Sequence, residues 1–339
     1  DLLSRQEAVL ETITLEVVKS SEIEGEILNS EQVRSSIARR LGMEIGGLVP
    51  SDRHVDGVVE MMLDATQKFD KKLTQDRLFG WHAALFPAGR SGMYKIIVGA
   101  WREDSHGPMQ VVSGSVGRER VHYEAPEARR LKSEMKEFLK WFNALSKGSV
   151  GDLDPVIKSA IAHLWFVTLH PFEDGNGRIA RAIADMQLAR ADGSRERFYS
   201  MSVQIRQERN DYYNILEKMQ KSTNVTKDGI DITSWLEWFL GCLNRALDTT
   251  ENTLDNVFKK ARFWQSQPVG SINKRQEKII NKLFEGFEGK LTSSKWAKIS
   301  KCSQDTALRD ILDLVEKDVL VKDSGGGRST SYSLKDASL

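Results

Sequence analysis

Residues 155–169, PVIKSAIAHLWFVTL, are apolar on nearly every side of the helix that their spacing predicts. Asp154 and Pro155 are typical of a helix start, and His170 precedes Pro171, which disfavours further helix. A helix that is apolar all round must be covered by other helices, so it predicts the centre of a bundle. Helical apolar spacing recurs in residues 55–69, 127–145, 179–191, 207–219 and 232–248.

The composition is that of a folded chain in a reducing compartment. Of 339 residues 40% are apolar, and the net charge of +1 gives no general attraction to nucleic acid or to an anionic membrane. Cys242 and Cys302 form neither a disulfide framework nor a metal-binding spacing, so we expect a cytoplasmic protein. The longest apolar runs fall far short of the roughly 20 residues that a bilayer requires, so we expect no membrane partner.

Two segments depart from the helical pattern. Residues 109–126 hold two β-prone stretches around SGSVG, which predicts a β-hairpin on the helical body. The C-terminal segment combines short helices with two short strands. We therefore expect four regions, with a mainly α fold throughout: an N-terminal helical region (1–70), a central domain (71–250), a linker helix (251–272) and a C-terminal domain (273–339).

The stretch LHPFEDGNGRIARAIAD, residues 169–185, has the features of a phosphate site. EDGNG is a tight turn, and a second helix is expected to begin near Arg178. The turn would present backbone N–H groups at a helix N-terminus, where anions bind. Arg178 and Arg181 share a face of that helix, and their charge opposes the helix dipole unless an anion lies between them and the N–H groups. A polyphosphate would fit there.

Two more residues of this stretch suit phosphate chemistry. Asp174 could hold Mg²⁺, which binds through one or two carboxylates and substrate oxygens. His170 is the side chain here whose pKa suits a general base near neutral pH. Asp-Gly and Asn-Gly are ordinary turn formers, so a structural loop remains the alternative for any one of these residues.

HPFEDGNGRIAR, residues 170–181, is similar at every specified position to HPFx(D/E)GNGRxxR, the signature of the Fic family. The resemblance implies a helical bundle with a β-hairpin flap over roughly residues 55–250. Members of this family typically transfer AMP from ATP to a Ser, Thr or Tyr hydroxyl of a target protein. Relatives that transfer phosphate have a lysine in place of the second motif glycine, so Gly177 favours AMP transfer.

The resemblance also assigns roles by position. His170 would deprotonate the target hydroxyl, and Asp174 would bind Mg²⁺ between the α- and β-phosphates of ATP. Arg178 would contact the phosphates, and Arg181 would contact the γ-phosphate. The anion hole would be formed by Gly175, Asn176 and Gly177.

Two further assignments leave an alternative open. Tyr212, Tyr213 and Gln220 lie where the family builds its adenine pocket, although the tyrosines could equally belong to the core. The hairpin at residues 109–124 would be the flap on which a target protein docks as an added strand. A plain surface hairpin is the alternative.

SSEIEG, residues 20–25, raises a conflict. Ser21 and Glu24 fit a helix-starting capping box, yet they lie within a helical pattern. The stretch also resembles the inhibitory motif (S/T)xxxE(G/N) of the family, with Ser20, Glu24 and Gly25 in the specified places. We expect Glu24 to pair with Arg181 and so occupy the γ-phosphate position, and Gly25 to allow close packing against the loop. A simple break between helices is the alternative.

Residues 273–339 resemble a winged helix, with a recognition helix over residues 306–317 and a wing over 319–334. The recognition helix is rich in acidic residues, whereas DNA phosphates require a basic face, which Arg328 and three lysines (Lys295, Lys298 and Lys301) could supply. The binding partner of this domain could therefore be DNA, another protein or a second copy of this chain. The residues expected on the buried side of this helix are Leu308, Ile311, Leu312, Leu314 and Val315.

The expected function is that of a protein adenylyltransferase with Mg-ATP, autoinhibited by Glu24. One alternative is a DNA-binding regulator whose Fic domain senses nucleotide or is silent. Another is an enzyme that removes AMP from a modified protein at the same site.

Overall fold

Helix α6 (Pro155–Leu169) begins and ends at the residues that the sequence predicts. The Asp154 carboxylate accepts hydrogen bonds from two backbone N–H groups of the first turn, which would otherwise lack partners. At the other end, His170 leaves the right-handed helical region, as expected before Pro171. It does so in the left-handed conformation (φ 48°, ψ 55°) and not in an extended one.

The computed structural model describes residues 2–335, except for 106, 115–117, 119, 145–152, 222–224, 227–228, 269, 285–286, 288 and 324–329. The chain divides into two units, one formed by residues 9–250 and the other by residues 1–8 and 251–339. None of the described helices combines the length and the apolar character needed to cross a bilayer.

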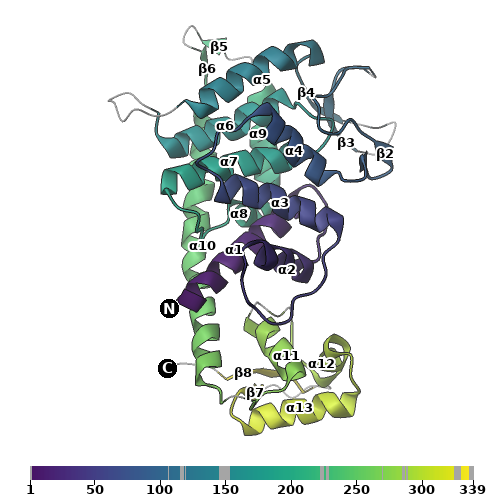
Figure 1. The fold of residues 1–339 in the computed structure, drawn as a ribbon, viewed down its shortest axis with the longest axis vertical. Helices are drawn as coiled ribbons and strands as arrows, with labels where there is room; N and C mark the ends of the chain where they lie inside the picture. Colours follow the sequence, from purple (N-terminus) through teal and green to yellow (C-terminus); the bar gives the residue numbers. More distant parts are fainter. Residues whose placement is uncertain are drawn as a thin grey trace. The chain divides into compact units, whose positions relative to one another are not determined.

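The chain up to residue 266 is mainly helical, and α6 lies beside α7 in the middle of the bundle (Figure 1). Phe138, Phe166 and Ile183 are fully buried around this pair. The other helices of this part are α1 (Leu2–Ile23), α2 (Ser30–Arg40), α3 (Arg53–Gln67), α4 (Gln75–Leu85), α5 (Ala128–Asn143), α7 (Asn176–Asp192), α8 (Met201–Gln207), α9 (Arg209–Lys221) and α10 (Thr233–Ser266).

The described strands form antiparallel pairs. The predicted hairpin is β3 (Gln110–Ser113) paired with β4 (Arg120–Glu124), with a shift of register between Val111 and Val112. The tip of this hairpin lies outside the described residues. The remaining pairs are β1 (Arg90–Ser91) with β2 (Tyr94–Lys95), β5 (Val225–Thr226) with β6 (Gly229–Ile230), and β7 (Leu320–Lys322) with β8 (Tyr332–Leu334).

Several predicted boundaries were wrong. Helix α7 begins at Asn176, two residues before the predicted start. The helix predicted over 207–219 corresponds to α9, which begins two residues later, because Glu208 leaves helical geometry between α8 and α9. The helix predicted to end at 248 continues to Ser266, so the expected linker is largely part of α10.

The capping-box pattern of Ser21 and Glu24 does not begin a helix, and the chain breaks there between α1 and α2. Both residues lie at the C-terminal end of α1 and not at the start of a helix. The Glu24 N–H donates to the Ser21 carbonyl at 3.1 Å, and the Gly25 N–H donates to the Glu22 carbonyl at 3.0 Å. Gly25 has φ +85°, so it closes the helix in the left-handed conformation typical of a C-terminal glycine. The turn that follows α1, residues 24–26, is called the carboxylate turn below.

The C-terminal unit has its own core. Helices α11 (Lys274–Phe284), α12 (Ser293–Ser300) and α13 (Gln304–Glu316) enclose Trp296 and Ile311, which are fully buried. The prediction that Leu308 and Leu312 face this core was wrong, since they are 42% and 52% exposed. The predicted wing tip, with Arg328, lies outside the described residues, and the winged helix stays a prediction.

Candidate active site

The motif loop, residues 170–177, is shaped by its own asparagine. The Asn176 amide nitrogen donates to the Phe172 carbonyl at 2.8 Å, and the Phe172 N–H donates to the Asn176 amide oxygen at 3.0 Å. Gly175 precedes α7 with φ +80°, and no side chain caps this helix. The first N–H groups of α7 are therefore available to an anion, which the helix dipole also favours.

His170 begins this loop and is partly buried. Its ring nitrogen Nδ1 lies 3.2 Å from the Val167 carbonyl, to which it can donate, so the lone pair is left on Nε2. Burial, reinforced by the charge of Arg102, lowers the pKa of His170 to about 4, although Glu24 and Asp174 act in the opposite direction. The imidazole is therefore neutral at pH 7 and can accept a proton.

Arg181 is buried on α7 and meets the C-terminal end of α1. Its Nη2 atom lies 2.8 Å from Glu24 Oε1, so the pair expected from the sequence is present in the structure. Nε donates to the Ser20 hydroxyl at 2.9 Å, and Nη2 also donates to the Ser20 carbonyl at 2.8 Å. The Nη1 atom is buried without a hydrogen-bond partner in the described structure, so Arg181 retains one donor for an anion.

Gly177, and not Gly25, allows the close approach of the carboxylate turn. A Cβ atom on Gly177 would lie 2.1 Å from Glu24 Oε1, closer than real Cβ contacts come, and 3.3 Å from Arg181 Nη1. A Cβ atom on Gly25 would meet nothing within 4 Å. The expected packing role of Gly25 was therefore wrong, and its positive φ explains the glycine instead.

Arg178 is paired with a carboxylate that the sequence reasoning missed. Its Nη1 atom lies 2.6 Å from Glu26 Oε2, and its guanidinium stands 5.2 Å from the centre of the Phe86 ring. The other oxygen of Glu26 binds His54. The signal available in the sequence was that Glu26 lies only two residues from Glu24, in the short turn that Gly25 closes after α1.

Asp174 has the character of a single magnesium ligand. Its carboxylate accepts a hydrogen bond from the Ser91 hydroxyl. Within the described residues no group of three acidic, histidine or cysteine side chains could hold a metal ion. An ion here would take its remaining ligands from water and phosphate oxygens, as Mg²⁺ does when it binds through one carboxylate. A single carboxylate is compatible with Mg²⁺, and the binding of Mg²⁺ by Asp174 stays a prediction.

The residues predicted for the adenine pocket take different positions. Tyr212 is buried, and its hydroxyl lies 3.0 Å from His163 Nε2. The Tyr213 hydroxyl donates to Glu24 Oε2 at 3.1 Å and lies 3.2 Å from the Ile23 carbonyl. The Gln220 amide donates to the Val167 carbonyl at 3.4 Å. Their contact with adenine stays a prediction, whereas the bond from Tyr213 to Glu24 was not foreseen.

The hairpin is anchored beside the motif loop. The Tyr123 hydroxyl donates to the carbonyl of Thr168, two residues before His170, at 2.8 Å. Glu217 of α9 binds both His122, at 2.6 Å, and Arg120, at 2.8 Å. The hairpin is thus held to α6 and α9 by residues of β4, while β3 keeps an edge to which a strand could add.

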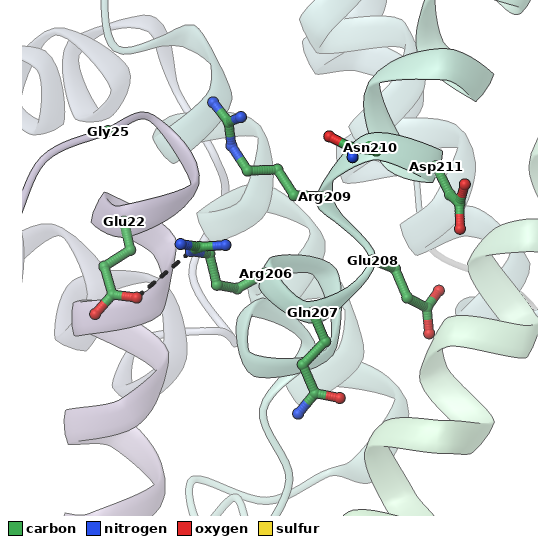
Figure 2. Close-up of a pocket in the computed structure, with 8 residues that line it drawn as sticks. All are labelled: Glu22, Gly25, Arg206, Gln207, Glu208, Arg209, Asn210 and Asp211. Atoms are coloured by element: carbon green, nitrogen blue, oxygen red, sulfur yellow. Dashed lines mark ion pairs between the residues drawn. The ribbon is translucent and has the colours of Figure 1, made fainter. Parts of the chain in front are cut away.

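A polar pocket lies beside the carboxylate turn (Figure 2). Glu22 points toward Arg206 there, with 3.5 Å between Oε2 and Nε, and it also binds Lys19 at 2.8 Å. Glu22 therefore contacts neither motif arginine, although it is only two residues from Glu24. The pocket is lined by Glu22, Gly25, Arg206, Gln207, Glu208, Arg209, Asn210 and Asp211.

Comparisons with known proteins agree with the motif. Residues 72–188 match the Fic/DOC family, and residues 1–43 match a domain of unknown function, DUF4172. Over 114 residues the chain is 32% identical to protein adenylyltransferase Fic from Drosophila yakuba, a match that covers 34% of this chain and 20% of that protein. The Drosophila mojavensis protein of the same name is also 32% identical over 114 residues, which are 34% of this chain and 19% of that protein.

A solved structure, a Fic domain containing signaling protein from Bacteroides thetaiotaomicron, has a similar fold. The TM-score is 0.51 and the identity 22%, over 77% of this chain and 90% of the other. This likeness shows the fold alone. The match to the curated relatives spans only about a fifth of their length.

Proposed function

Because residues 72–188 of this chain form a Fic domain, we propose that the protein transfers AMP from Mg-ATP to a hydroxyl group of a target protein. The observation that supports this most directly is the arrangement of residues 170–181. A neutral imidazole stands at one end, and two buried arginines at the other are each neutralised by an internal carboxylate. The curated relatives named protein adenylyltransferase support the same reaction class.

In this reaction the Nε2 atom of His170 accepts the proton of the target hydroxyl. The hydroxyl oxygen forms a bond to the α-phosphorus of ATP, and the bond from that phosphorus to the bridging oxygen breaks. Pyrophosphate leaves with the electron pair, so the target carries a phosphodiester-linked AMP. The proton on His170 then returns to solvent.

The other residues of the motif bind charge. The N–H groups at the start of α7 and the donors of Arg178 and Arg181 would hold the polyphosphate, because the Arg178 Nε and Arg181 Nη1 atoms are buried without partners in the described structure. Asp174 would hold Mg²⁺, which when bound neutralises phosphate charge.

We further propose that the carboxylate turn is autoinhibitory. Glu24 and Glu26 neutralise the two arginines that a triphosphate would need. ATP must displace these carboxylates, so its affinity in the productive pose is reduced by the stability of the resting contacts. Two residues of one turn would thus act as an internal competitor for the triphosphate.

Labelling with ATP tests the reaction. Incubation of the Glu24→Gly chain with ATP labelled on the α-phosphate should transfer label to protein, and His170→Ala in the same background should abolish it. ATP labelled on the γ-phosphate should transfer nothing. Absence of label from both nucleotides in the Glu24→Gly chain would overturn the proposal, and label from the γ-phosphate alone would indicate phosphate transfer.

For the C-terminal unit we propose a protein partner in preference to DNA. The exposed side of α13 carries Leu308 and Leu312 together with Asp305, Arg309 and Glu316, so it lacks the clearly basic character that phosphates need. The full chain should show no salt-dependent binding to duplex DNA. Binding that weakens steeply with salt would contradict this proposal.

A further inference from the structure

Arg102 is a buried arginine that lies outside the motif and forms hydrogen bonds to its backbone. Its Nε atom donates to the His170 carbonyl at 2.7 Å. Its backbone N–H donates to the Pro171 carbonyl at 2.9 Å. The residue is only 3% exposed, so these bonds form away from water. Two successive carbonyls of the motif loop are therefore held by one residue.

The other end of the guanidinium holds the base of the hairpin. Nη1 lies 2.8 Å from Asp104 Oδ1, and Nη2 donates to the Pro126 carbonyl. The second oxygen of Asp104 accepts from the Ala128 N–H at 2.5 Å, where α5 begins. Since Pro126 follows β4 by two residues, the Arg102 side chain joins the root of the hairpin to the backbone of His170.

His170 needs such support. It is one of few described non-glycine residues with positive φ, a conformation that L-residues adopt at a cost in free energy. Its carbonyl lies at the C-terminal end of α6, where carbonyls lack helical partners and a cation is favoured. Arg102 supplies both the donor and the positive charge, so it stabilises the backbone that presents the imidazole.

We propose that Arg102 is a positioning residue, which fixes the imidazole of His170 relative to the hairpin on which the target docks. This inference rests on the proposed function, because it assumes that His170 is the base and β3–β4 the docking site. The positive charge of Arg102 supports the same role, because it favours the neutral imidazole of His170. The other charged groups near the ring, Glu24 and Asp174, favour the protonated imidazole.

Two substitutions separate geometry from charge. Arg102→Met removes the positive charge and the hydrogen bonds of the guanidinium. Arg102→Lys keeps the charge, but the lysine amine cannot reach the His170 and Pro126 carbonyls together. The matched control is Arg77→Met. Arg77 is also largely buried and binds both the carboxylate and the carbonyl of Asp64, at 2.6 and 2.7 Å, and its other guanidinium bonds go to carbonyls of residues 68–72 and not to the motif loop.

The first readout is the titration of the His170 ring by NMR in the full chain, assigned with His170→Ala. We expect Arg102→Met to raise the pKa of His170, and Arg102→Lys and Arg77→Met to leave it near its original value. This readout does not depend on AMP transfer. An unchanged titration in Arg102→Met would overturn the proposed link between the two residues.

The second readout is the steady-state rate of AMP transfer in the Glu24→Gly background. We expect kcat to fall about tenfold or more in both Arg102 variants, because misplacing a reacting group by a fraction of an ångström is costly. KM for ATP should stay within about twofold, since Arg102 binds no phosphate. A drop in thermal stability with kcat unchanged would reduce Arg102 to a structural residue. If no variant transfers AMP, the proposed function fails, while the titration still decides whether Arg102 controls His170.

Discussion

The two motif arginines are equally buried but are neutralised in different ways. Arg181 has three acceptors, all from the end of α1: the Glu24 carboxylate and two oxygens of Ser20. Arg178 has one carboxylate, Glu26, which it shares with a histidine. The contacts of Arg181 therefore require the end of α1 to pack against α7, whereas the ion pair of Arg178 requires only the Glu26 side chain. Four predictions test this difference, from the largest expected effect to the smallest.

Glu24→Gly should raise the initial rate of AMP transfer about tenfold or more, which corresponds to the loss of at least ~1.4 kcal/mol of competition. The same variant should have a lower melting temperature without ATP, because Arg181 then lacks its charged partner. ATP should raise that temperature more than in the original chain. Glu22→Gln is the control and should change neither rate nor ATP response. An unchanged rate in Glu24→Gly would mean that residues 20–25 only form a break between two helices and have no inhibitory role.

Glu26→Gln should raise the rate a few-fold, since partly exposed ion pairs contribute up to about 1 kcal/mol. The gain should be larger in the Glu24→Gly background, where the γ-phosphate position is already free. The rate as a function of ATP concentration should show a lower KM in the double variant. A gain from Glu26→Gln alone that equals the gain from Glu24→Gly would mean that both pairs block ATP equally.

Tyr213→Phe removes one hydrogen bond to Glu24 and should raise the rate by about twofold, because one such bond contributes roughly 1 kcal/mol or less. The effect should vanish in the Glu24→Gly background. A lower rate in both backgrounds would instead support the predicted contact of Tyr213 with adenine. Initial rates at saturating and at low ATP distinguish these outcomes.

His54→Gln should reduce stability in a limited pH window. The hydrogen bond that His54 donates to Glu26 raises the pKa of His54 above 6.5, and His54 with Arg178 lowers the pKa of Glu26 below 4.5 despite its burial. The contribution of His54 is present below pH 6.5 and is lost as pH rises through its raised pKa. The contribution of Glu26 to stability is present above pH 4.5 and is lost as pH falls through its lowered pKa.

The difference in melting temperature between the original chain and His54→Gln should therefore be largest between about pH 4.5 and 6.5 and shrink above it. Denaturation at pH 5.5 and pH 9 measures this. A difference that is independent of pH would exclude an ionic contribution from the pair. The ion pair between Arg181 and Glu24 contains no histidine, so the effect of Glu24→Gly on the melting temperature should change little between pH 5.5 and pH 9.

The sequence predicted the elements that local chemistry determines. The start of α6 follows from Asp154 and Pro155, and its end from the residue before Pro171. The resemblance placed Glu24 beside Arg181, although 157 positions separate them in the chain. These predictions succeeded because each depends on a few neighbouring residues or on a motif with fixed spacing.

What the sequence did not reveal depends on tertiary contacts. Arg102 lies in an unremarkable stretch, and its buried bonds exist only because the motif loop and the hairpin root meet around it. Leu308 and Leu312 fit the apolar spacing of a buried face, but the small C-terminal core is already filled by Ile311 and Leu314. Apolar spacing shows which faces could be buried, whereas the neighbouring elements decide which are.

The space beside Gly177 can hold either of two anionic groups. The missing side chain of Gly177 leaves room for the Glu24 carboxylate at rest and, under the proposed function, for a phosphate during the reaction. A methyl group at this position would push the Glu24 carboxylate away from its place beside Arg181. Under the proposed function, a side chain at 177 would therefore weaken the contact of Glu24 with Arg181 and crowd the phosphate in one change, so the resting state and the reaction could not be altered separately at this position.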